Sequence, residues 1–193
     1  IITRIERIFM KKQTIIIVVV MVLMVVLGVI LFSNSKSTNL NTTKDLVSMM
    51  NSIKKNGELP ELETKKIDYK DQEQVTSYTG LTSNENIEGL VVAEPMIGSQ
   101  AYSAVAIKVK NGANIENMKQ EILDHIDMSK WICVTAEKLY ITNSDQIIFF
   151  VMSDEEWATI TYQAFKNYVN NKIGKELEKT ESDIELPDEM IVE

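Results

Sequence analysis

The sequence predicts an α+β fold: an N-terminal transmembrane helix, then one domain in which helices alternate with β-hairpins. A run of 18 apolar residues, 15–32, contains no charge and no proline. After this run, apolar residues recur at helical spacing in three segments and in strand-like patterns in two pairs of segments. The predicted order is helix, hairpin, helix, hairpin, helix. This order favours helices packed on an antiparallel sheet of about four strands.

The apolar run is long enough to cross a bilayer. A helix of 18 residues at about 1.5 Å per residue spans about 27 Å, close to the hydrocarbon thickness. A cleavable signal usually has a shorter apolar centre followed by small residues, and Ser33 and Ser35 make a poor cleavage pair. Lipid attachment needs a cysteine directly after the run, whereas the single cysteine is Cys133. We therefore expect a retained anchor, with secretion after signal cleavage as the alternative.

The flanking charges predict the orientation of this anchor. Four basic residues precede it, and the first charge after it is Lys36. Because basic flanks remain on the cytoplasmic side, residues 1–14 are expected inside the cell and the rest outside. The protein would then be a single-pass protein of the cell membrane with an extracytoplasmic domain.

The exported part divides into a stalk, a domain and a tail. Residues 33–44 are rich in Ser, Asn and Thr, which predicts a short flexible stalk. Residues 45–173 predict one α+β domain with its own core. Residues 174–193 are acidic and poor in large apolar side chains, which predicts a disordered tail.

A first amphipathic helix is predicted where four apolar residues recur at helical spacing: Leu46, Met49, Met50 and Ile53. Thr42 or Thr43 can cap its N-terminus, and Gly57 can end it. The segment 57–71 is highly charged and is predicted to be a charged connection. Residues 72–81 predict one or two helical turns before Gly80.

The first hairpin is predicted from IEGLVVAEP and AYSAVAIKVKNG, which are rich in Val and Ile. In the second of these, Val105, Ile107 and Val109 alternate with smaller or polar residues, which predicts a strand buried on one face. The next segment, 113–127, has apolar residues at helical spacing and Asn114 as its predicted N-cap.

The second hairpin and the last helix follow directly. KLYIT and IIFFVMS flank the turn NSDQ, and the six consecutive apolar residues of the latter strand predict a central position with both faces covered. Ser153, followed three residues later by Glu156, predicts a capping box at the start of the last helix.

The charge of the exported part excludes some partners. From Ser33 onward it carries 16 lysines against 27 acidic residues, a net charge of −11. Nucleic-acid binding depends on clusters of Lys and Arg, so no nucleic-acid partner is expected. Docking onto an anionic lipid surface is disfavoured for the same reason.

Few residues are candidates for chemistry. His125 is the only histidine, and a metal site needs three or four converging ligands, so we expect a solvated helix residue. Cys133 has apolar neighbours and is expected to be a buried small hydrophobe rather than a nucleophile. The sequence has no nucleophile elbow and no glycine-rich phosphate loop. No catalytic, cofactor-binding or metal-binding residue is therefore predicted, and no cofactor is expected.

The loop of the first hairpin is the candidate partner-binding site. It contains Glu94, Pro95, Met96, Ile97 and Gly98. Loops on a rigid sheet are where binding residues concentrate. The alternative interpretation is an ordinary hairpin turn.

Four motifs resemble a known family: GELPEL, AEPM, YSAVAIKVKNG and SDQIIFFVMSDEEW. They resemble the bacterial domain of unknown function numbered 4358, over about residues 58–165. The resemblance implies export by a Gram-positive bacterium, often as a lipoprotein, and implies no catalytic residue. This chain departs from the family in lacking a cysteine after its apolar run.

Together these observations predict an uncharacterised single-pass membrane-anchored protein that acts as a binding or interaction module of the bacterial cell envelope. Its partner would be another envelope protein or a wall component. The alternative is an envelope hydrolase whose site is assembled from scattered carboxylates.

Overall fold

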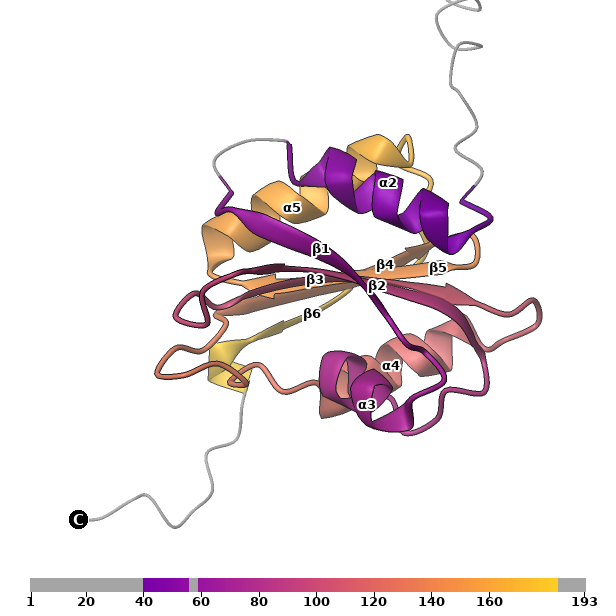
Figure 1. Cartoon of the computed structure of the whole chain (residues 1–193), viewed down its shortest axis with the longest axis horizontal. Helices are drawn as coiled ribbons and strands as arrows, with labels where there is room; N and C mark the ends of the chain where they lie inside the picture. Colours follow the sequence, from indigo (N-terminus) through magenta and orange to yellow (C-terminus); the bar gives the residue numbers. More distant parts are fainter. Residues whose placement is uncertain (1–39, 56–58, 184–193) are drawn as a thin grey trace, which may run out of the picture. The chain divides into compact units, whose positions relative to one another are not determined.

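The computed structural model describes residues 40–55 and 59–183, which form a three-layer α+β domain (Figure 1). An antiparallel sheet of six strands lies in the middle, with α2 and α5 on one face and α3 and α4 on the other. The elements are, in order, α2 (Thr43–Ile53), β1 (Leu62–Ile67), α3 (Gln72–Thr79), β2 (Ile87–Pro95), β3 (Tyr102–Val109), α4 (Ile115–His125), β4 (Lys138–Ser144), β5 (Ile147–Ser153), α5 (Glu155–Tyr168), β6 (Leu177–Thr180) and the 3₁₀ helix η1 (Glu181–Asp183).

The α+β class is confirmed, but the expected count of about four strands is wrong. The spatial order is β1-β2-β3-β5-β4-β6, and β1 and β6 extend the two predicted hairpins at opposite edges. β1 lies within the segment predicted as a charged connection, and β6 lies within the segment predicted as a disordered tail. Both are edge strands with a single neighbour, so charged side chains cover much of their surface and obscure the strand pattern.

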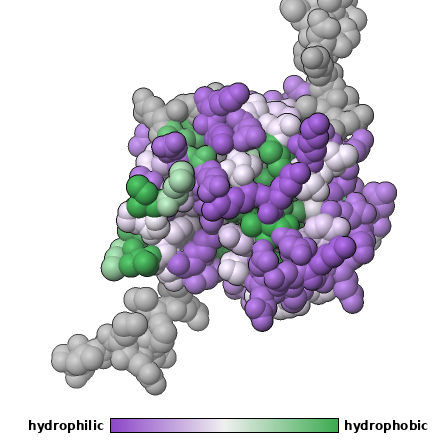
Figure 2. Space-filling view, in the orientation of Figure 1, coloured by the Kyte–Doolittle hydropathy of each residue, from purple (hydrophilic) through white to green (hydrophobic). Residues whose placement is uncertain are grey.

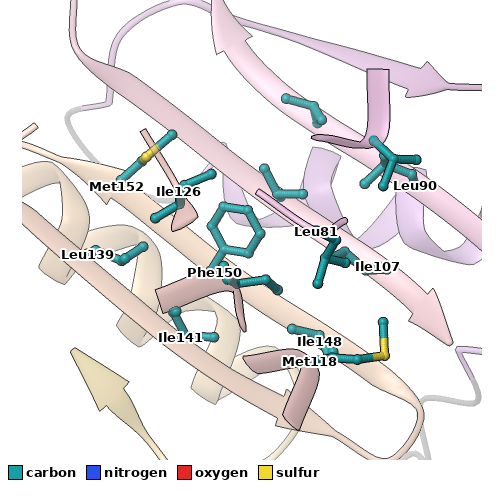
Figure 3. Close-up of a cluster of buried hydrophobic side chains, with 14 of the residues drawn as sticks. Leu81, Leu90, Ile107, Met118, Ile126, Leu139, Ile141, Ile148, Phe150 and Met152 are labelled. Carbon is teal, nitrogen blue, oxygen red and sulfur yellow. The ribbon is translucent and has the colours of Figure 1, made fainter. Parts of the chain in front are cut away.

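The central strand β5 is buried along its whole length, as the apolar run predicted. Its alternate residues enter different layers: Phe150 packs against the α3 and α4 side, and Phe149 packs against the α2 and α5 side. Figure 3 shows Phe150 among the side chains of the α3 and α4 side. The Phe149 ring stacks on Phe165 of α5, with 4.2 Å between ring centroids.

β3 differs from its prediction because both of its faces are covered. Val105 and Ile107 belong to the α3 and α4 layer, while Ala104 and Ala106 belong to the α2 and α5 layer. The alternation of large and small residues therefore marks two different core layers. It does not mark one buried and one solvated face.

The predicted helix caps at Thr42 and Asn114 are confirmed. Thr42 and Asp45 form a reciprocal capping box, and the Asn114 side chain accepts a hydrogen bond from the Asn117 amide. The cap of α5 is Asp154, whose carboxylate accepts from the Trp157 amide at 2.8 Å. Ser153, the predicted cap, is instead the last residue of β5.

The predicted cytoplasmic flank, the transmembrane helix, most of the stalk, Gly57 and residues 184–193 lie outside the described residues. Within the described ranges, no helix is both long enough and apolar enough to cross a bilayer.

Candidate functional site

The predicted partner-binding loop projects from the end of the sheet between β2 and β3. Glu94 and Pro95 end β2 and are half-buried, whereas Met96 and Ile97 are 73% and 67% exposed. Gly98 faces open space, since a side chain added there would meet no atom within 4 Å. The tip of this loop therefore presents two large aliphatic side chains to solvent.

The structure adds a second loop that sequence reasoning missed. The connection from α4 to β4 passes beside the same end of the sheet, and its Ile132 is 78% exposed. Met96, Ile97 and Ile132 are the exposed large hydrophobic residues of the described ranges, and together we call them the apolar platform. Figure 2 shows apolar surface on the side where these two loops project in Figure 1.

An ion pair joins the α4–β4 loop to Glu94, at the end of β2 where the β2–β3 loop begins. The Lys130 Nζ lies 2.6 Å from the Glu94 Oε1 and also donates to the Ser103 hydroxyl at 3.3 Å. Both charged side chains are largely shielded from solvent. Because screening by water is reduced at such a position, this pair should hold the loops together better than a fully exposed pair would.

Two aromatic rings surround the same ammonium group. The Lys130 Nζ lies 5.2 Å from the ring centroids of both Tyr78 and Trp131, within the range of cation–π attraction. Partial burial raises the pKa of the Tyr78 hydroxyl, and the nearby Glu94 charge raises it further. Lys130 thus connects α3, the β2–β3 loop and the α4–β4 loop.

The α4–β4 loop is held at both ends by hydrogen bonds. The Asp127 carboxylate accepts from the amide and the hydroxyl of Ser129, both at 2.8 Å. The Ala136 amide donates to the Met128 carbonyl at 2.8 Å. These bonds restrain the loop and so reduce the entropy lost when a partner contacts Ile132.

The expectation that Cys133 is buried is wrong. Its side chain is exposed, and its backbone has φ of 60°, in the left-handed region. Its apolar sequence neighbours suggested a core position, but Ile132 is itself exposed in this loop. The loop extends beyond the end of the sheet, where even apolar side chains such as Ile132 are exposed to solvent.

His125 is an exposed residue at the C-terminal end of α4, as predicted. With Asp127 and Lys130 it lines an open hollow of about 400 Å³ below the α4–β4 loop. Across residues 40–55 and 59–183, no group of three or more His, Cys, Asp or Glu residues is arranged to hold a metal ion.

The platform and the start of the described chain lie at opposite ends of β3. Leu40 lines a hollow together with Lys108 and Ile147, near the C-terminal end of β3. Ser103, which contacts Lys130, lies near the N-terminal end. At about 3.3 Å per residue, Ser103 and Lys108 of β3 are separated by about 17 Å.

No family model, curated protein or solved structure matches the chain. The resemblance to the domain of unknown function numbered 4358 stays a prediction.

Proposed function

We propose that this protein is a membrane-anchored, extracytoplasmic interaction module of a bacterial cell envelope, and that it binds its partner through the apolar platform. The observation that carries the proposal is the exposure of Met96, Ile97 and Ile132 on two loops joined by the Lys130–Glu94 ion pair. Single exposed aliphatic residues are ordinary on protein surfaces. Three on two linked loops of one sheet end are a better candidate for an interaction site.

The construction of the platform favours binding. Loops held by a rigid sheet are the usual position of binding residues. The ion pair and the loop hydrogen bonds order the platform before any partner arrives, which reduces the entropic cost of association. Its small size favours a weak and reversible contact over a permanent interface.

The chemistry of the platform favours a protein partner. Methionine and isoleucine side chains offer apolar surface, which matches an apolar patch on another envelope protein better than a hydroxyl-rich wall glycan. The platform also lies at the end of β3 opposite Leu40, where the chain arrives from the predicted stalk. That arrangement keeps the platform away from the predicted point of attachment.

The pairing of carboxylates supports a binding module over the hydrolase alternative. Glu94, Glu116 and Glu178 each lie within 3 Å of a lysine ammonium group. Glu176 accepts a hydrogen bond from the Tyr162 hydroxyl at 2.7 Å. Glu94, Glu176 and Glu178 thus join different elements of the domain, while Glu116 pairs within α4.

A photo-crosslinking experiment in cells tests the proposed site. A photoreactive amino acid placed at Ile97 should yield a discrete crosslinked product. That product should disappear when Met96→Ser and Ile132→Ser are introduced together. An Asn111→Ser variant, in the exposed turn after β3, is the matched control and should retain the product. Equal crosslinking in all three chains would refute the platform as the binding site.

Cell fractionation tests the proposed anchor separately. The full chain should sediment with membranes, whereas a chain that begins at Lys36 should remain soluble. A secreted form with the mass of the shorter chain would show that the apolar segment is cleaved.

A further inference from the structure

The described chain ends next to the C-terminal end of the α4–β4 loop, the loop that carries Ile132. Thr180 of β6 pairs with Lys138, the first residue of β4, and the Glu181 amide donates to the Glu137 carbonyl at 3.0 Å. Figure 1 shows β6 ending on the side of the domain where the α4–β4 loop lies. Glu137 follows Ile132 by five residues in the sequence, so these two residues are separated by at most about 17 Å.

Two hydrogen bonds determine where the chain leaves η1. The Asp183 Oδ2 accepts from the Thr180 amide at 2.8 Å and from the Thr180 hydroxyl at 2.7 Å. The carboxylate therefore folds back onto the end of β6. Asp183, the last described residue, is thus held at this end of the sheet.

The ten residues that follow Asp183 are rich in apolar side chains, which suit contact with an apolar surface. Residues 184–193 have the sequence IELPDEMIVE, and half of them are large and apolar: Ile184, Leu186, Met190, Ile191 and Val192. Ten extended residues span up to about 33 Å. That reach exceeds the greatest possible separation of Glu137 from Ile132.

We propose that residues 184–193 dock in cis on the apolar platform and compete there with the partner. The competition with the partner rests on the proposed function, whereas the docking of the segment does not. A stable dimer interface needs about 800 Å² from each subunit, far more than three side chains supply, whereas a short apolar segment needs only a few contacts. Tethering raises the effective concentration of the segment to the millimolar range, so a weak contact covers the platform for much of the time.

The charges at the exit point also favour this occupant. The segment contains four acidic residues and no basic residue. Lys138 and Lys179 lie close to Asp183, where hydrogen bonds from Thr180 lower the pKa of the carboxyl group and the two lysine charges lower it further. An acidic segment that starts here therefore begins beside Lys179 and beside Lys138, which also pairs with Glu178 at 2.9 Å.

Cys133 makes the proposal directly measurable. It is the only cysteine in the chain, it is exposed, and it adjoins Ile132. We expect a maleimide reagent to label Cys133 in membranes containing the full chain at least about threefold more slowly than in a chain that ends at Asp183, because a segment bound two thirds of the time protects the thiol to that extent. Addition of a synthetic peptide of residues 184–193 at millimolar concentration should slow labelling of the shortened chain again.

Point variants test whether the apolar side chains of residues 184–193 are responsible for the protection of Cys133. A full chain with Leu186→Ser and Ile191→Ser should label as fast as the shortened chain. Glu193→Gln, the matched control, should label as slowly as the parent. Equal labelling rates in the full and shortened chains would overturn the proposal. Protection that disappears when the protein is diluted in the membrane would also overturn it, because the cover would then be a second copy.

The crosslinking experiment at Ile97 distinguishes failure of this inference from failure of the proposed function. If both are right, the shortened chain should give more crosslinked partner than the full chain. Protection of Cys133 without any crosslinked partner supports docking in cis and refutes the proposed function. A platform-dependent crosslink with equal labelling rates supports the proposed function and refutes docking in cis.

Discussion

The Lys119 ammonium group donates to the Lys175 carbonyl oxygen at 2.7 Å, which joins α4 to the segment that leads into β6. The Lys119 side chain is completely buried. It also contacts the Asn143 Oδ1 at 2.8 Å and the Glu116 carboxylate at 2.7 Å. A buried ammonium group is tolerated when such partners replace its water. These contacts explain why the sheet continues into residues that were predicted to be disordered.

Replacement of Lys119 by methionine should loosen this edge of the sheet. The substitution keeps most of the side-chain volume but leaves the Asn143 amide oxygen without its Lys119 donor and the Lys175 carbonyl with only the long 3.4 Å bond from the Thr142 hydroxyl. We expect a loss of about 2 kcal/mol in the free energy of unfolding and faster hydrogen exchange at the amides of β6. Lys172→Met, at an exposed lysine, is the control and should change neither. An unaltered β6 in the Lys119→Met variant would contradict the assigned role.

Gly80 should not tolerate a side chain. Its φ is 74°, and an added Cβ would lie 2.8 Å from the backbone carbon of His125 and from the backbone nitrogen of Ile126. Gly80→Ala should therefore lower the free energy of unfolding by about 2 kcal/mol or more, through backbone strain and the overlap with α4. Gly98→Ala, in open space, should have almost no effect. Urea titrations of both variants give the comparison, and equal midpoints would show that α3 can move away from α4.

Loss of the ion pair between the two loops should weaken the order of the platform. Glu94→Gln removes the charge that faces Lys130 and should cost about 1 kcal/mol in the free energy of unfolding. A spin label on Cys133 should become more mobile, because Lys130 no longer holds the α4–β4 loop against β2. Glu88→Gln, at an exposed position of β2, should leave the label unchanged. Equal mobility in all chains would show that the loop hydrogen bonds are sufficient.

The buried Tyr102 predicts a loss of stability at alkaline pH. Burial raises the pKa of its hydroxyl far above the ordinary value, although the hydrogen bond with Thr161 at 2.9 Å acts in the opposite direction. Above pH about 10, the unfolded chain releases this proton while the folded chain keeps it. The unfolded state is then favoured, so the contribution of Tyr102 is complete below pH 10 and is lost as the pH rises further.

Unfolding in urea at pH 8 and at pH 11 tests this effect. Tyr102→Phe should be less stable at pH 8, by about 1 kcal/mol for the lost hydrogen bond, but should lose less stability than the parent between the two pH values. Tyr69→Phe, at a half-buried tyrosine, should follow the parent. A parallel decline in the parent and the Tyr102→Phe variant would exclude Tyr102 as the cause.

Local patterns predicted the elements whose own residues carry the signal. Leu46, Met49, Met50 and Ile53 are all buried on one face of α2, as their spacing indicated. β2 has the predicted bounds, and the unbroken apolar run of β5 is central in the sheet. In these cases the spacing of the apolar residues along the chain matches the faces of the element that pack against the core.

The candidate site was only partly predictable. The loop with Met96 and Ile97 was found because a hairpin connection is exposed by its position between two strands. Ile132 was missed, since the apolar neighbours of Cys133 suggested a buried segment. No residue pattern indicated that Lys130 would pair with Glu94, because these two residues are 36 positions apart in the sequence and meet only after the sheet has formed.

The sequence by itself determined the α+β class, the two hairpins, the helices and the N-caps of α2 and α4, because each depends on interactions within a few residues of chain. The tertiary structure alone decided the edge strands β1 and β6, the exposure of Cys133, the burial of Lys119 and the gathering of Met96, Ile97 and Ile132 at one end of the sheet. These features depend on contacts between distant segments. A charged edge strand is stabilised by its neighbour's backbone, and a buried lysine by partners from other elements, so the physical cause lies outside the local sequence.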